Sequence, residues 1–189
     1  KVREADVIRI PPVRVSAVSS RVVVPPRLMD SIPILFEDDH MIVVNKPAGL
    51  AVHGGTGLDY GLIEAFRAVF VNNPFLELVH RLDRETSGCL MLAKSRKTLL
   101  GLQELMSGKR NMQKRYQALV AGNWIARNQK VAFALRRKNE AGKDKRMVVD
   151  RAGQNSLSII NTIREFEIAT LLDVDLKTGR MHQARSEER

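Results

Sequence analysis

The sequence predicts an α+β fold built on a mixed, mainly antiparallel sheet with flanking helices. Short apolar runs recur along the chain, and turn-forming Gly, Pro and charged residues separate them, as is typical of strands. Few stretches place apolar residues at helical spacing. Strands and helices do not alternate regularly, which disfavours a parallel sheet made of βαβ units.

Residues 1–30 are expected to form the end of one domain and an extended linker. The sequence Val7–Ile10 predicts the end of a strand. Proline pairs follow at 11–12 and 25–26, and because proline cannot donate a hydrogen bond to a sheet, they favour an extended chain. The composition becomes typical of a globular domain after this linker, so we place the second domain at 31–189.

The first part of this second domain is predicted to contain a hairpin and a short helix. Ile32–Phe36 and Met41–Val44 are apolar and flank a charged turn, which indicates two antiparallel strands. A loop rich in Gly and Pro follows. The helix is predicted from apolar residues that recur at helical spacing. These residues are Leu62, Ile63, Phe66, Val69 and Phe70.

The middle of the domain is predicted to hold two strands around a charged loop, and then a second helix. Leu76–Val79 enters the loop His80–Ser87, and Cys89–Ala93 is an apolar run suited to a buried strand, with Cys89 in the core. Ser95 is placed to cap the following helix. The apolar face of that helix comprises Leu99, Leu102, Leu105 and Met106.

The last part of the domain is predicted to consist of strands. Tyr116–Val120 alternates apolar with polar or small residues, as a half-buried strand does. Further apolar runs predict strands at 146–149, 157–163 and 166–174, and a turn follows at 177–180. These strands would extend the antiparallel sheet.

The charge balance points to a polyanionic partner. The chain has 31 Lys and Arg residues against 21 Asp and Glu, a net charge of +10 and a pI near 10.2. Aromatic residues make up only 5%, which disfavours binding of single strands by base stacking alone. Many of the basic residues fall into two clusters. The first comprises Lys94, Arg96, Lys97, Lys109, Arg110, Lys114 and Arg115, and the second comprises Arg136, Arg137, Lys138, Lys143, Lys145 and Arg146.

Composition also disfavours other classes of function. The apolar runs fall far short of the roughly 20 residues of a membrane span, so we expect a cytoplasmic protein with no membrane association. The single cysteine, Cys89, excludes an internal disulfide framework and a cysteine-based zinc site. His53 and His80 lack a matching group of ligands, so no metal site is predicted.

The segment His80–Gly88 concentrates residues capable of chemistry, with the sequence His-Arg-Leu-Asp-Arg-Glu-Thr-Ser-Gly. Arg81 and Arg84 flank Asp83, and nearby cations favour the ionised carboxylate. Such a carboxylate can act as a nucleophile or a base. Alternatively, Asp83 and Glu85 only form surface ion pairs with the two arginines. The residues by themselves leave both interpretations open.

This segment closely resembles the catalytic motif of the large pseudouridine synthase family, which modifies uridines in ribosomal and transfer RNA. Other segments resemble motifs of that family in the same order, and the likeness extends from Ile32 to Arg185. They are Asn45–Gly49, Val52–Gly55, Gln113–Val120 and Thr178–Arg185. Val7–Val15 resembles the end of the small RNA-binding domain that precedes the catalytic domain in many members. The resemblance thus implies that residues 31–189 form the catalytic domain.

The resemblance also implies a reaction without cofactor or metal, in which one aspartate isomerises uridine to pseudouridine. That role falls on Asp83, as nucleophile toward the anomeric carbon or as base toward the sugar. Arg81 takes the place of the flipped nucleotide, Tyr116 stacks on the uracil and takes part in proton transfer, and Arg185 pairs with Asp83. Further substrate contacts are expected from Arg84, His80, Lys46 and His53. We expect the two basic clusters to flank Asp83 and to hold RNA phosphates.

The same resemblance favours large-subunit ribosomal RNA as substrate and a monomeric enzyme. The final motif departs from the family pattern at Met181 and Ala184, and family members continue beyond it, so we expect the chain to be a fragment that is incomplete at its C-terminus. A non-catalytic RNA-binding or ribosome-assembly fragment is therefore one alternative. A glycosidase with two carboxylates is another, and it needs a partner about 5–9 Å from Asp83, for which only Glu85 is near in sequence.

Overall fold

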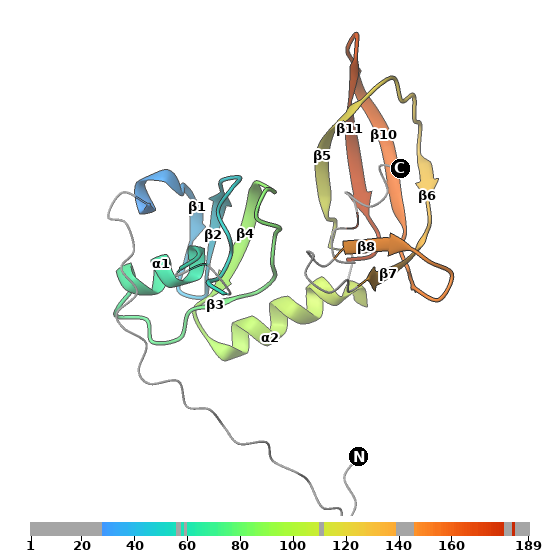
Figure 1. Cartoon of the computed structure of the whole chain (residues 1–189). Coiled ribbons are helices and arrows are strands. Elements are labelled where there is room, and N and C mark those ends of the chain that lie inside the picture. The colour runs from blue at the N-terminus through green and yellow to red at the C-terminus, as the bar shows by residue number, and fades with distance from the viewer. Residues whose placement is uncertain are drawn as a thin grey trace, which may run out of the picture.

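Antiparallel sheets and two α-helices make up the described part of the chain (Figure 1). The computed structural model describes residues 28–55, 58, 60–109, 112–138, 146–179 and 183, so the strand predicted at Val7–Ile10 lies outside these residues. Every strand pairing within them is antiparallel. This confirms the prediction of an α+β fold with a mainly antiparallel sheet.

The first sheet contains the predicted hairpin and lies beside the first helix. Its strands are β1 (Ile34–Glu37), β2 (Met41–Lys46), β4 (Gly88–Ala93) and β3 (Glu77–Leu78), in that spatial order. Along β2 the side chains alternate, and Ile42, Val44 and Lys46 are buried on one face. That face of the sheet is covered by α1 (Leu62–Val69).

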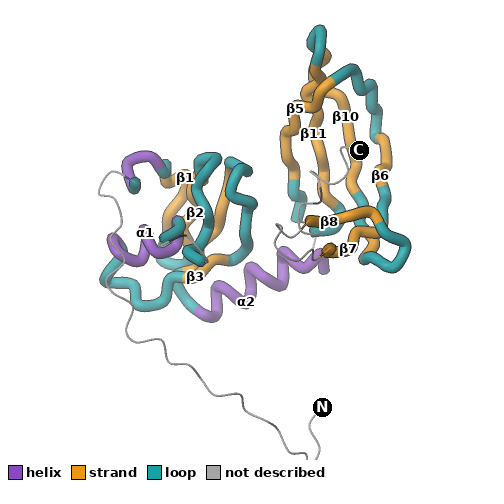
Figure 2. Tube along the Cα trace, viewed as in Figure 1, coloured by secondary structure: helices purple, strands orange, loops and turns teal. Residues whose placement is uncertain are grey.

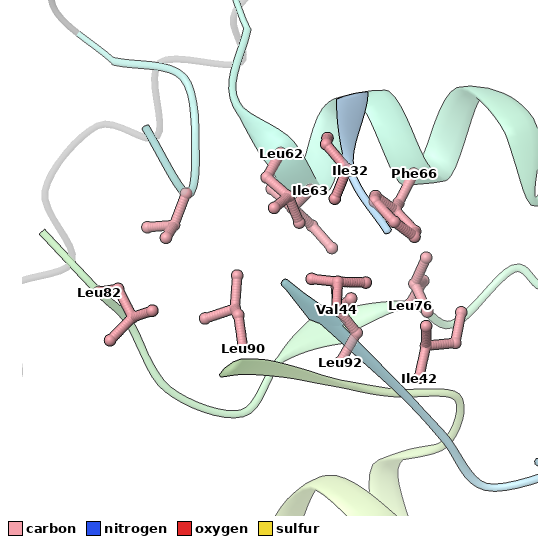
Figure 3. Packing of buried hydrophobic residues seen from close by; sticks show 11 residues of the cluster. Ile32, Ile42, Val44, Leu62, Ile63, Phe66, Leu76, Leu82, Leu90 and Leu92 are labelled. Atoms are coloured by element: carbon pink, nitrogen blue, oxygen red, sulfur yellow. The ribbon is translucent and has the colours of Figure 1, made fainter. Parts of the chain in front are cut away.

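The first core is the buried cluster between this sheet and α1 (Figure 3). The helix contributes three of the residues predicted from its periodicity, Leu62, Ile63 and Phe66, whereas Val69 is 57% exposed. Burial of each such side chain stabilises the fold by about 1.5–3 kcal/mol. The first core comprises Ile32, Ile42, Val44, Val52, Leu62, Ile63, Phe66, Leu76, Leu82, Leu90 and Leu92.

The second helix runs from the first sheet toward the second (Figure 2). Ser95 caps α2 (Arg96–Glu104) as predicted, because its Oγ accepts a hydrogen bond from the Thr98 N–H at 3.1 Å. A π-helical turn, η2 (Leu105–Lys109), continues it. The apolar face predicted for this helix is only half-buried.

The prediction that Cys89 lies in the core is wrong, because its side chain is exposed. Along β4 the alternation places Leu90 and Leu92 on the core face, and Cys89 on the opposite face.

The second sheet has the spatial order β5 (Arg115–Ala121), β11 (Ala169–Leu176), β10 (Ser158–Glu165), β6 (Gln129–Val131). The predicted strand at 166–174 begins later, at Ala169, because the Phe166 N–H bonds the Ala169 carbonyl and closes a turn. The short polar strand β6 was not predicted. One face of this sheet carries the second core, which comprises Ala126, Val131, Ile160, Leu172, Val174 and Leu176.

A small third sheet follows the order β8 (Arg146–Val149), β7 (Ala134–Lys138), β9 (Gln154–Asn155). The strand β8 was predicted, and β7 and β9 were not. Gly153 leads into β9 in close contact with β7. A Cβ added there would lie 2.5 Å from the carbonyl carbon of Leu135, so no larger residue fits.

Candidate active site

Asp83 lies in the loop between β3 and β4, which bulges toward β5 of the second sheet (Figure 1). Leu82, the residue before it, is buried in the first core, while Asp83 itself is half-buried. The Asp83 carbonyl accepts a hydrogen bond from the Thr86 N–H at 3.1 Å, which closes a turn. Burial of its neighbour and this turn therefore fix where the carboxylate is presented.

Hydrogen bonds tie the Asp83 loop to the loop that follows β2. The Gly49 N–H donates to the Arg84 carbonyl at 2.9 Å, and Arg84 Nε donates to the Gly49 carbonyl at 2.9 Å. Lys46 Nζ donates to the same Arg84 carbonyl at 2.9 Å. The residue after Asp83 is thus held in place by backbone and side-chain contacts.

Lys46 is buried, although the sequence predicts that it touches the substrate. Its side chain is 0% exposed, and Nζ also donates to the carbonyls of Pro47 and Leu50 at 2.9 and 2.8 Å. Burial lowers the pKa of this ammonium, and the nearby negative charges of Glu85 and Asp83 oppose that shift. With its three donors used inside the protein, Lys46 has no surface to offer a phosphate, and the prediction does not fit this burial.

Tyr116 brings the second sheet to Asp83. Its side chain on β5 packs against both the first and the second core. Burial raises the pKa of the Tyr116 hydroxyl, and the negative charge of Asp83 raises it further. Asp83, in a loop of the first sheet, and Tyr116, on a strand of the second, come from separate motifs and lie within electrostatic reach of each other.

His80 is held inside the protein at the start of the Asp83 loop. Its Nε2 accepts a hydrogen bond from the Met91 N–H at 3.3 Å. Burial lowers the pKa of the imidazole, a backbone hydrogen bond with Arg81 opposes the shift, and the positive charge of Lys114 adds to it. His80 is therefore neutral near pH 7, and it ties the loop to β4.

The remaining predicted residues of this loop are exposed. Arg81 points away from the core, as a residue that enters RNA must. Arg84 Nε lies 3.7 Å from Glu85 Oε1, and both side chains are more than half exposed. The surface ion pairing that the sequence left open as an alternative is therefore present between Arg84 and Glu85.

His53 precedes α1 and lies against the N-cap residue of that helix, Gly61. Its side chain is exposed, and its backbone packs so closely on Gly61 that a Cβ there would lie 2.6 Å away. Glu64 Oε2 accepts hydrogen bonds from the Gly54 and Gly61 N–H groups and fixes this approach. A contact between His53 and the substrate stays a prediction.

Arg185, the predicted partner of Asp83, lies outside the described residues. Gln183, in the same motif, is described and is 2% exposed. It donates to Ser158 Oγ at 2.9 Å and accepts from Thr178 Oγ1 at 2.8 Å. The sequence assigned no role to Gln183. Its position within the final motif was the signal that could have identified it. Its hydrogen bond with Ser158 anchors that motif to β10.

The basic clusters are partly engaged within the protein. Lys94 pairs with Glu37 at 2.7 Å, Arg115 with Asp173 at 2.6 Å, and Arg136 with Asp150 at 2.6 Å. Several other members lie outside the described residues. They are Arg110, Lys143 and Lys145. That these clusters flank Asp83 and hold RNA phosphates stays a prediction.

Two further observations concern only the part of the chain that the structure describes. None of its helices is both long and apolar enough to cross a bilayer. No group of three or more His, Cys, Asp or Glu side chains within it gathers where it could hold a metal ion.

Comparison with known proteins identifies relatives of this chain. A family model described as RNA pseudouridylate synthase matches residues 40–187. Proteins named ribosomal large subunit pseudouridine synthase C match 98% of the chain. Those of Buchnera aphidicola (from Acyrthosiphon pisum) and Escherichia coli K12 are 40% and 44% identical to it, and the match covers 59% of each relative. The Haemophilus influenzae protein is 45% identical, with 58% of its length covered.

Solved structures agree on the fold. Human RNA pseudouridylate synthase domain containing 4 has a TM-score of 0.62 at 26% identity, over 81% of this chain and 62% of that one. Human RNA pseudouridylate synthase domain containing 1 has a TM-score of 0.67 at 22% identity, over 82% of this chain and 63% of that one, and it bears on the fold alone.

Proposed function

The chain belongs to the RNA pseudouridylate synthase family, and from this we propose that it isomerises uridine to pseudouridine in large-subunit ribosomal RNA. The matched relatives carry the name ribosomal large subunit pseudouridine synthase C, and the chain spans about 59% of their length. The observation that carries the proposal is the approach of Asp83 and Tyr116 from two sheets. The net charge of +10 supports an RNA substrate.

In the proposed mechanism Asp83 supplies the negative charge that the reaction needs. The glycosidic bond breaks, the uracil turns over, and a bond from carbon to the sugar replaces it. Asp83 either attacks the anomeric carbon or removes a proton from the sugar, and the turn and the hydrogen bonds around its loop hold it in place for either role. Chemistry on a base requires that the nucleotide leave its stack, and exposed Arg81 fills the space it vacates.

Tyr116 stacks on the uracil and mediates the late proton transfer in this proposal. Its raised pKa keeps the hydroxyl protonated at neutral pH, so it can donate a hydrogen bond beside the carboxylate. Arg185 pairs with Asp83 and orients it, and exposed Arg84 and His53, with His80, contact the RNA. Lys46 instead positions the Asp83 loop through the Arg84 carbonyl. We further propose a monomeric cytoplasmic enzyme that uses neither cofactor nor metal.

The proposal is tested by tritium release from unmodified ribosomal RNA transcripts that carry tritium at carbon 5 of uridine. We expect the wild-type chain to release tritium and D83N to release it at least about 10³-fold more slowly, because the amide is neither nucleophile nor base. RNA binding by D83N should stay within about threefold of wild type, since Asn has nearly the same shape.

Two outcomes would contradict this assignment. Full activity in D83N removes Asp83 from the chemistry. RNA binding without turnover by the wild-type chain, unaffected by D83N, instead supports the non-catalytic RNA-binding fragment. The matched control is K130M, which removes one exposed charge from β6 and should leave tritium release unchanged.

A further inference from the structure

Lys114 directly precedes β5 and lies on the same side of the extended chain as Tyr116. From Met112 to Val120 burial alternates, with the even-numbered residues half-buried and the odd-numbered ones exposed. Side chains two residues apart on an extended chain share a face, so Lys114 and Tyr116 both face the Asp83 side of β5. The Lys114 carbonyl accepts a hydrogen bond from the Leu176 N–H at 2.8 Å, which fixes its backbone beside the end of β11.

The Lys114 ammonium lies near the turn that follows β11 and within electrostatic reach of the Asp83 loop. A Cβ on Gly179 would be 3.4 Å from Lys114 Nζ, so the ammonium lies directly over this exposed glycine. Its positive charge also reaches His80 at the start of the Asp83 loop. Two segments that are distant in sequence thus lie near one positive charge beside the candidate active site.

The ammonium has no acidic partner among the described residues. Three other described lysines have partners, since Lys94 pairs with Glu37, Lys177 with Asp175, and Lys46 with backbone carbonyls. None of the ion pairs formed between described residues includes Lys114. A half-buried ammonium that no described carboxylate neutralises can attract a bound anion.

We propose that Lys114, over Gly179, forms a subsite for a phosphate of the RNA strand beside the target uridine. This inference rests on the proposed function. Lysine binds phosphate as a compact point charge, and phosphate contacts fix the register of a nucleic acid on a protein. Lys114 and Tyr116 are about 7 Å apart along the strand. The start of β5 and the residue before it therefore present a base-stacking residue and a phosphate-binding residue to the same nucleotide region.

The first experiment measures the affinity of a large-subunit ribosomal RNA transcript across a series of KCl concentrations. Each lost phosphate contact reduces the slope of log affinity against log salt by about 0.7–0.9. We expect K114M to show this loss and to bind about 5–10-fold more weakly at low salt. K114R should keep the wild-type slope, because it keeps the charge. K130M should also keep it, because Lys130 neighbours buried Val131 and faces the opposite side of the second sheet.

The second experiment uses inorganic phosphate and does not depend on the RNA. We expect added phosphate to shift the imidazole NMR signal of His80 in the wild-type chain and not in K114M, because the anion would bind next to Lys114.

The outcomes separate the two proposals. If the wild-type chain forms no pseudouridine but phosphate still shifts His80 only when Lys114 is present, the proposed function fails and the anion subsite stands. If pseudouridine forms while K114M keeps the wild-type salt slope and phosphate response, the subsite is wrong and the proposed function stands.

Discussion

Lys46 and Asp83 show how burial assigns different tasks to two charged residues of neighbouring motifs. Lys46 has no exposed surface, so its ammonium stabilises carbonyls of two loops. Asp83 is half-buried, and its negative charge acts to raise the pKa of both Lys46 and Tyr116. The first charge therefore holds the loop in place, and our proposal assigns the chemistry to the second.

His80 gives the fold a pH dependence whose sign follows from its burial. The pKa of His80 is lowered from the ordinary value of 6.5, so the folded chain binds this proton less readily than the unfolded chain. Above about pH 6.5 the imidazole is neutral in both states and the stability is fully present. As the pH falls further, the unfolded chain gains the proton first, and the free energy of unfolding decreases until the folded pKa is passed.

We therefore expect urea unfolding to show a smaller loss of stability in H80Q than in wild type between about pH 7.5 and 5.5. Glutamine does not titrate, and its amide oxygen can accept the hydrogen bond from the Met91 N–H that His80 Nε2 accepts. Equal losses in the two proteins would show that His80 does not carry this dependence.

At the scale of elements, Gly88 starts β4 in a backbone conformation that glycine adopts far more readily than other residues. Its φ is +122°, and a Cβ there would meet no atom within 4 Å, so only backbone strain opposes a larger residue. We expect G88A to lower the free energy of unfolding by about 1–3 kcal/mol in urea titrations. Because Gly88 closes the Asp83 loop, G88A should also slow tritium release.

Gly101 offers the matched substitution. It lies inside α2, and a Cβ there would also meet no atom within 4 Å. Alanine is favoured over glycine in a helix, so G101A should raise the free energy of unfolding by about 0.5–1 kcal/mol. Changes of the same sign in G88A and G101A would refute the argument from backbone conformation.

The elements that sequence predicts are those whose own pattern decides their structure. The apolar run of β2, the alternation in β5, the helical spacing in α1 and the Ser95 cap are local signals, and the structure confirms each of these elements. The strands β6 and β9 are short and polar, and pairing with β10 and β7 makes them strands. The motifs likewise identify Asp83 and Tyr116, whereas the burial of Lys46 and the surroundings of Lys114 depend on contacts between distant segments.

At the scale of the whole molecule, the candidate active site lies where two separate cores meet. The first core supports the Asp83 loop through Leu82, and the second supports β5 through Leu172 and Val174. Tyr116 packs against both. The distance between the Asp83 carboxylate and the Tyr116 hydroxyl therefore depends on the contacts between the two halves of the chain.

Tyr116 should consequently couple the unfolding of the two halves. Y116A removes a ring shared by both cores, and we expect it to lower stability by about 2–4 kcal/mol and to split the urea transition or reduce its apparent m value. Y116F keeps the ring, so it should unfold in one transition like wild type while it slows tritium release.

The unfolding transition is followed by two probes. Far-ultraviolet circular dichroism reports on the whole chain. Trp124 fluorescence reports on the second half, because Trp124 packs against the second core. If both probes coincide in Y116A with the wild-type m value, contacts other than Tyr116 couple the halves, and the ring serves the substrate alone.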